Sequence, residues 1–307
     1  MAHNQLSGYQ GSGLILLLTY RADRRTLAYM TITTALLIVQ WNLAAIQPII
    51  YLWFLFMAVS VAIIAHNHNH VPIWKSRFLN ILTDYWLTLF YGFPAFVWIP
   101  THNKNHHLLN NKKGDYTLTY RVSEKNNIFT LLSYPAVSSY FQQKPIANYL
   151  RNLWRSNRLK FYLAASQYLV LGLYYTVAVF LNWKKAVLFI VIPHQVSLFS
   201  VLIFNYVQHV HTDEESKFNH ARNFVGLINL TLFNNGYHTI HHEAPGIHWS
   251  ETPAAQKKIQ NLIDPSLNER SFWWYILRVY LLAPFHPRFG TVSKRLERIN
   301  ARPVRTA

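Results

Sequence analysis

Four long apolar runs without charged residues constrain this sequence more than any other feature. They cover residues 27–46, 48–65, 161–181 and 186–204. Each is close to the roughly 20 residues that an α-helix needs to cross a bilayer. A fifth run, 79–99, contains Asp84, Gly92 and Pro94, and we expect it to be re-entrant or interfacial. The sequence therefore predicts an all-α integral membrane protein with four transmembrane helices.

The positions of lysine and arginine indicate how such a protein is oriented. The chain carries 29 Lys and Arg against 12 Asp and Glu, a net charge of +17. With four crossings, every basic residue except Lys184 and Lys185 falls on one side, and basic residues favour the cytoplasmic side. We therefore expect both termini in the cytoplasm, together with a helical cap formed by about 100–160 and 206–307, and residues 1–307 as a single domain.

Histidine is the unusual residue of this chain, with 16 copies. Eleven of them form four short clusters, which are HNHNH at 66–70, HNKNHH at 102–107, HVH at 209–211 and HTIHH at 238–242. Histidines three or four positions apart lie on nearly the same face of a helix, so His66 pairs with His70, and His102 with His106. Imidazole suits iron, copper, nickel and zinc, and eight or nine imidazoles are enough for two ions.

The rest of the composition narrows the class of function. The chain has no cysteine, which excludes Cys-ligated iron–sulfur clusters and thiolate haem. No nucleic-acid recognition motif accompanies the basic residues, so we expect contact with membrane lipids and not with nucleic acid. A His-rich metal transporter is a distant alternative, because the four clear runs hold no acidic residue to form an ion path. An inactive lipid-sensing relative is a further alternative.

The boxes HNHNH, HNKNHH and HTIHH, in this order and beside apolar runs, resemble those of the integral-membrane fatty acid desaturase and hydroxylase superfamily. The resemblance covers about residues 27–250. It implies four transmembrane helices under a cytosolic cap that holds a non-haem di-iron centre, which uses O2 and two electrons to attack C–H bonds of acyl or alkyl chains. The implied iron ligands are His66, His70, His102, His106, His107, His209, His238, His241 and His242. Asn205, four residues before His209, is implied as a water-mediated contact to the metal.

The resemblance leaves the reaction open. Box two has three residues between its first histidine and its histidine pair, where many desaturases have two and alkane hydroxylases have three. The segments on either side of the last box resemble bacterial members of the superfamily. These include acyl desaturases, terminal alkyne-forming desaturases and an alkene-forming fatty-acid decarboxylase. We favour a fatty acyl desaturase of a bacterial inner membrane, with its site on the cytoplasmic side.

The implied partners are a substrate and an electron donor. The substrate is a fatty acid, a thioester of acyl carrier protein or CoA, or a lipid acyl chain. The donor is an external protein such as ferredoxin or rubredoxin, which are acidic and would suit the basic cytoplasmic face.

The sequence also suggests walls for a substrate channel and two alternative roles for a segment near the C-terminus. Candidate walls of a substrate channel are the aromatic runs 53–56, 85–96 and 168–175. Residues 272–282 suit either a core helix of the cap or an interfacial helix with Trp273, Trp274 and Tyr275 at the headgroups. We expect His68, which faces away from its neighbours on a helix, to lie outside the ligand set.

Overall fold

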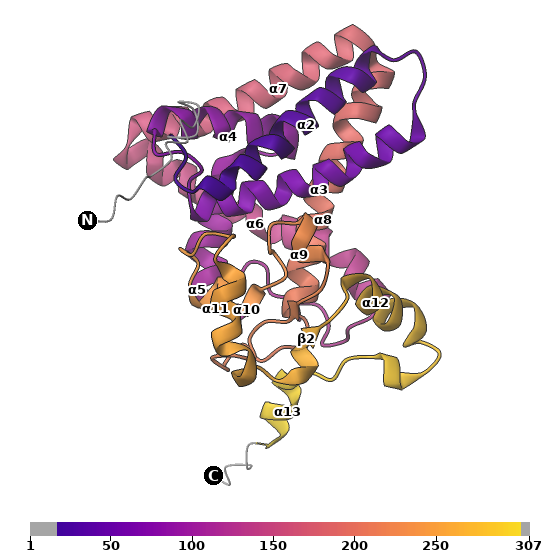
Figure 1. Ribbon diagram of the computed structural model, residues 1–307. Helices are drawn as coiled ribbons and strands as arrows, with labels where there is room; N and C mark the ends of the chain where they lie inside the picture. The colour runs from indigo at the N-terminus through magenta and orange to yellow at the C-terminus, as the bar shows by residue number, and fades with distance from the viewer. Residues whose placement is uncertain (1–16, 302–307) are drawn as a thin grey trace, which may run out of the picture.

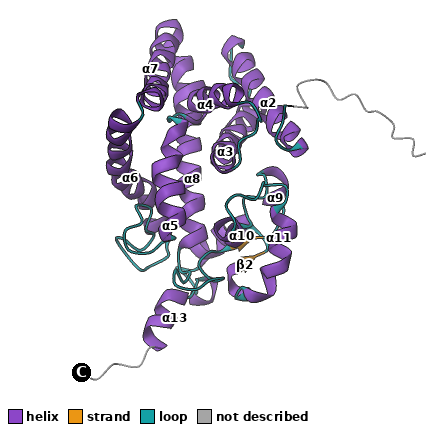
Figure 2. Ribbon diagram, turned by 90° about the vertical axis from the view of Figure 1, so that its left-hand side faces the viewer, coloured by secondary structure: helices purple, strands orange, loops and turns teal. Residues whose placement is uncertain are grey.

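A computed structural model describes residues 17–301, which are mostly helical (Figures 1 and 2). The ends of the predicted single domain, and so both termini, lie outside these residues. The long helices are α2 (Arg24–Asn42), α3 (Pro48–His70), α4 (Arg77–Tyr91), α6 (Ile128–Ser156), α7 (Arg158–Ala186) and α8 (Ile192–His209). The short 3-10 turn η1 (Arg21–Asp23) precedes α2, and between the long helices lie the 3-10 turn η2 (Ala95–Val97) and the π-helices η3 (Ile99–His106) and η4 (Val187–Val191).

Within residues 17–301, two helical runs are long and apolar enough to cross a membrane. They are Pro48–His70, with a mean hydropathy of 2.3, and Arg158–His209, with a mean hydropathy of 2.2. The second run is interrupted at Asn182, whose φ of −165° and ψ of 100° are extended and not helical. It therefore consists of two helical parts, and Figure 1 shows the sharp turn between them. Helix α2 is not among these runs, and the four crossings stay a prediction.

Helix α4 occupies most of the segment predicted to be re-entrant or interfacial. Its 15 residues rise about 22 Å, which is less than the ~30 Å hydrocarbon core of a bilayer. The helix ends at Gly92, whose φ of 83° is in the left-handed region. A Cβ at this position would lie 2.4 Å from the Cβ of His194, so only glycine allows the chain to turn here against α8.

Helix α3 lies at the centre of the helical bundle. It packs against α2, α4 and α8, and its residues 60–66 are all buried. Because the last of these residues is His66, the packing that fixes α3 also fixes the first histidine box.

The segment after α8, together with the short α5, forms short elements below the bundle in Figure 1. They are α5 (His107–Leu109), β1 (Asn223–Phe224), α9 (Ile228–Thr231), α10 (His238–Glu243), α11 (Thr252–Ile259), η5 (Gln260–Leu262), η6 (Pro265–Leu267), β2 (Asn268–Glu269), α12 (Phe272–Ile276), η7 (Leu277–Leu282), η8 (Pro287–Phe289) and α13 (Lys294–Ala301). Strands β1 and β2 pair in parallel, with Asn223 opposite Asn268.

The buried side chain of Arg222 joins these elements to α8. Its guanidinium donates hydrogen bonds to the carbonyls of Val207 and Val210, at 3.1 and 2.8 Å, and to the hydroxyl of Tyr275 at 3.2 Å. These bonds, together with the Glu269 carboxylate 4.0 Å from the Arg222 Nε, offset the cost of burying the charge.

Residues 272–282 have one buried and one exposed face. Trp273 and Trp274 are 76% and 48% exposed, whereas Tyr275 is fully buried. Of the two alternatives for this segment, the buried Tyr275, whose hydroxyl accepts a hydrogen bond from Arg222, fits a core helix, and the exposed tryptophans fit an interfacial one. The helix belongs to the core on one side and presents tryptophans on the other.

Candidate metal centre

Nine histidines from four segments converge at the lower end of the helical bundle. They come from the ends of α3 and α8, from η3 with α5, and from α10. The first group is His66, His70, His102, His107 and His241, and the second group is His106, His209, His238 and His242. Within each group the candidate ligand atoms all lie within 4.8 Å of one another. These nine are the histidines that the sequence singled out as iron ligands.

The spacing of the ring nitrogens in the first group fits a bound cation. The Nε2 atom of His66 lies 3.0 Å from Nε2 of His102 and 2.9 Å from Nε2 of His241. A neutral imidazole has a single N–H, so such close nitrogens cannot all be joined by hydrogen bonds. Nitrogen ligands about 2.1 Å from one ion and about 90° apart would be about 3.0 Å from each other. In addition, Nε2 of His70 is buried without a hydrogen-bond partner.

The second group has the same spacing. The Nε2 atom of His209 lies 3.1 Å from Nε2 of His106 and 2.9 Å from Nε2 of His238. His242 contributes a nitrogen 3.2 Å from that of His238. The two groups are adjacent, because the rings of His107 and His242 stack with centroids 4.5 Å apart. The residues present therefore fit two neighbouring metal ions.

The π-helix η3 decides how the second box is divided. In a π-helix the backbone repeats at i and i+5 rather than i and i+4, so His102 aligns with His107. Their Nε2 atoms are 3.0 Å apart. His102 was expected to pair with His106, and their rings do stack. The two histidines nevertheless belong to different groups, since His106 lies in the second group.

The last box is positioned by a glycine at the start of α10. A Cβ on Gly236 would lie 2.1 Å from the carbonyl oxygen of Phe224 and 2.6 Å from Oδ1 of Asn229. The Gly236 N–H donates to that Asn229 oxygen at 2.8 Å. The backbone before His238 therefore lies directly against β1, which brings the box beneath α3 and α8.

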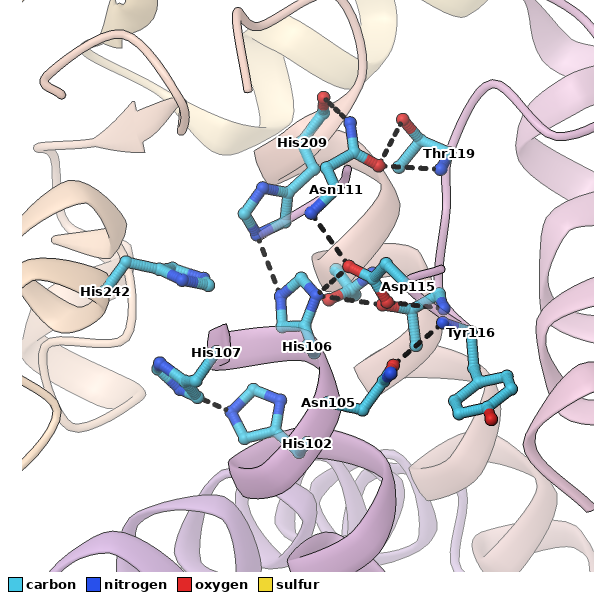
Figure 3. A network of polar contacts seen from close by, with 12 residues as sticks. His102, Asn105, His106, His107, Asn111, Asp115, Tyr116, Thr119, His209 and His242 are labelled. Carbon is cyan, nitrogen blue, oxygen red and sulfur yellow. Dashed lines mark hydrogen bonds and ion pairs between the residues drawn. The ribbon is translucent and has the colours of Figure 1, made fainter. Parts of the chain in front are cut away.

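A buried carboxylate, Asp115, orients one of the histidines (Figure 3). Its Oδ2 lies 2.8 Å from Nδ1 of His106 and also accepts the backbone N–H of Asn111 at 2.8 Å. The hydroxyl and N–H of Thr117 donate to the other oxygen, both at 2.7 Å. With its Nδ1 proton held by Asp115, His106 presents its Nε2 lone pair to the second group.

Sequence reasoning did not find Asp115. The sequence feature that could have indicated a turn leading to it is the asparagine pair Asn110 and Asn111, which both adopt positive φ (46° and 62°). Asparagine tolerates this conformation, and here it ends the helix and begins the loop that carries the carboxylate. The Asn111 side chain also donates to the carbonyl of His209 and accepts from Thr119.

Burial favours the neutral form of four imidazoles of the site. Burial, and then the neighbouring imidazoles, hold the pKa of His102, His238, His241 and His242 well below the ordinary value of 6.5. Burial opposes ionisation of Asp115, but His106 and the hydrogen bonds from Thr117 leave its pKa lowered overall. Neutral imidazole is the form that binds a metal ion.

A cavity of about 390 Å³ leads from the histidines between α3, α6 and α8. Its inner end is lined by His66, His102 and His238, and its walls are mostly apolar side chains from these helices and from residues 91–98. The volume is within the range of ligand sites, ~300–1,000 Å³. Among the described residues that line it, none is charged.

Of the other residues that the sequence analysis singled out, some line this cavity and some lie outside it. Asn205 lines the cavity and donates to the hydroxyl of Tyr134 at 2.6 Å. His68 lies outside both groups, 3.5 Å from Asp84. Of the three candidate aromatic runs, 85–96 contributes lining residues to this cavity, whereas 53–56 and 168–175 do not. Trp53 is half exposed and Tyr168 packs against Phe96.

Comparison with protein families decides the identity of this arrangement. The family model described as "Fatty acid desaturase" matches residues 40–274, which is more than half of the chain and includes all nine histidines. The chain belongs to the fatty acid desaturase family. Comparison with curated proteins and with solved structures finds no match. As a member of the desaturase family, the protein is an oxidoreductase that acts on fatty acyl chains, and its two histidine groups are compatible with metal binding.

Proposed function

We propose that this protein is an O2-dependent di-iron enzyme that introduces a double bond into a fatty acyl chain. The observation that carries the proposal is the meeting of nine imidazoles, in two adjacent groups, with one end of a largely apolar cavity. Nitrogen-rich ligand sets favour redox-active transition metals over magnesium or calcium, and desaturation needs a redox metal.

The chemistry supplied by two bound iron ions is activation of O2 for removal of hydrogen from unactivated methylenes. Two methylenes lose one hydrogen each, and with O2, two electrons and two protons the products are a double bond and two water molecules. Asp115 holds the proton at Nδ1 of His106, so that Nε2 stays free to bind metal. The apolar walls of the cavity exclude water and direct a chain toward His66, His102 and His238.

We further propose that the site faces the cytoplasm under four transmembrane helices. These are α2, α3 and the two parts of 158–209 that meet at Asn182. The close approach of His66 and His102 supports this arrangement, because a crossing between them would separate their boxes. Reporters at residues 67 and 101 should both be accessible from the cytoplasm; accessibility from opposite sides would contradict the topology.

The electrons are proposed to come from a separate acidic protein such as a ferredoxin or rubredoxin. The net charge of +17 supports attraction of such a donor. Rising salt should slow the reduction of the enzyme, because surface attraction is screened within about 8–10 Å at physiological salt. A rate that does not change with salt would contradict steering by charge.

The test of the function is mass spectrometry of lipids and headspace from cells that express the chain with a ferredoxin donor. A product two hydrogens lighter at unchanged carbon number supports the desaturase, and a His106→Ala strain should lack it. A product one oxygen heavier would make the enzyme a hydroxylase, a volatile alkene one carbon shorter a decarboxylase, and a terminal alkyne an alkyne-forming desaturase. Purified protein that contains zinc alone with activity intact would contradict the di-iron centre.

A further inference from the structure

The cavity that reaches the histidines opens sideways between two helices. Four of its lining residues on α6 lie four, three and four positions apart, on one helix face, and all are exposed: Leu132, Ala136, Ser139 and Gln143. Across from them on α8, Gln195 and Phe199 also line the cavity and are exposed. The opening is therefore a slot between α6 and α8, which lie side by side in Figure 2.

The slot runs along α8, away from the histidines. The Thr130 hydroxyl of α6 accepts from that of Tyr206, at 2.7 Å, and Asn205 donates to Tyr134. Farther along α6, Gln142 and Gln143 line the same cavity as Gln195. Ten positions of α8 separate Gln195 from Asn205, which is about 15 Å of helix.

One wall of the slot belongs to a helix apolar enough to lie in a bilayer, and the other wall, on α6, exposes large apolar side chains. Helix α8 belongs to the run 158–209 that is apolar enough to cross a membrane. On α6, Phe129 and Leu132 are 79% and 54% exposed, and exposed apolar surface of this kind marks contact with lipid or another apolar partner. A chain in the inner leaflet would meet the slot without passing through water.

The chemistry of the slot argues against a phosphate-bearing carrier bound inside it. The polar groups near its mouth are the neutral side chains of Ser139, Gln142, Gln143 and Gln195, and no charged residue is among the described lining residues. Recognition of CoA or phosphopantetheine phosphates normally uses arginine or lysine. Neutral hydrogen-bonding groups suit a chain whose end group is uncharged or remains at the membrane surface.

We propose that the substrate is a long apolar chain already dissolved in the bilayer, which reaches the histidines through the slot between α6 and α8, and not an acyl thioester delivered from water. The identity of the chain as a substrate depends on the proposed desaturase function. The route itself depends only on the cavity and its opening.

Photolabelling tests the route. The protein in phosphatidylcholine vesicles that contain a diazirine-bearing long-chain fatty alcohol is irradiated, and labelled peptides are mapped by mass spectrometry. We expect labels on lining residues of α6 and α8. Ala136→Trp, which places a large side chain at the exposed mouth, should lose most of this labelling, whereas Leu173→Trp, on an exposed face of α7 outside the cavity, should keep it. Undiminished labelling in Ala136→Trp, or labelling of the cavity only by a diazirine-bearing acyl-CoA added from water, would overturn the proposal.

The failure of the route and the failure of the function are distinguishable. If the wild type forms product but Ala136→Trp is labelled like the wild type, the route is wrong and the function stands. If no product forms but the cavity is labelled and Ala136→Trp prevents it, the route stands and the function is wrong.

Discussion

At the residue scale, Asp115 is the side chain on which the second histidine group depends most. Groups that hydrogen-bond to a metal-ligating histidine typically contribute 10–100-fold to metal affinity or activity. Asp115→Asn keeps the shape of the side chain but removes the negative charge that faces Nδ1 of His106. We expect metal affinity of the second group to fall about 10–100-fold. The measurement is the iron that the protein retains after dialysis against a chelator, which should decrease by about half.

Asp84→Asn is the matched control. Asp84 also faces a histidine, His68 at 3.5 Å, but neither residue belongs to the two groups. This variant should retain its iron like the wild type. Equal iron loss in both variants would mean that Asp115 acts only through general stability and does not position His106.

The candidate metal ligands could be predicted from the sequence, whereas the carboxylate beside them could not. The nine histidines were visible because their spacing and position beside apolar runs are local properties of the sequence. Asp115 could not be predicted in this role, because it reaches His106 only when the loop that carries it, nine residues later in the chain, folds back onto that histidine. The candidate walls at 53–56 and 168–175 do not line the cavity, because an aromatic run alone does not reveal which face lines a cavity and which face meets lipid.

At the element scale, helix α10 depends on the absence of a side chain at Gly236. Gly236→Ala would place a Cβ 2.1 Å from the Phe224 carbonyl oxygen, and the backbone would have to shift. Overpacking of this kind typically costs about 1–3 kcal/mol. We expect a lower thermal midpoint and weaker iron binding, measured on the same preparation, because His238, His241 and His242 move with the helix.

Gly246, just after α10, provides the control for this substitution. A Cβ there would have no heavy atom within 4 Å, so Gly246→Ala should leave both the midpoint and the iron content unchanged. Loss of iron in Gly246→Ala, or normal iron in Gly236→Ala, would show that close packing against β1 does not position the box.

Helix positions were largely predictable, but their details were not. The apolar runs 48–65 and 161–181 lie within α3 and α7, because hydrophobicity over about 20 residues is a strong signal. The π-helix η3 left no periodic signal that sequence reasoning used, and it changed the pairing of His102 from His106 to His107. Local backbone form thus decided how the imidazoles are shared between the two groups.

At the scale of the whole molecule, the buried imidazoles link folding to pH. Burial lowers the folded-state pKa of His102, His238, His241 and His242 below the value of about 6.5 in an unfolded chain. Below pH 6.5 the unfolded state therefore binds more protons than the folded state, and the free energy of unfolding falls as pH falls. Each histidine contributes at most about 1.4 kcal/mol per pH unit in this range.

We therefore expect the thermal midpoint of the metal-free protein to fall steadily between about pH 7 and pH 5.5, before most carboxylates titrate. Iron-loaded protein should have a higher midpoint at each pH, because an ion that binds only the folded state stabilises it. It should also lose iron on acidification, since protons compete for the same nitrogens. The measurement is scanning fluorimetry of both forms in detergent across this range. A metal-free midpoint that stays constant or rises toward pH 5.5 would show that these four imidazoles are not held neutral by the fold. Identical midpoints with and without iron would show that the two groups do not hold the metal.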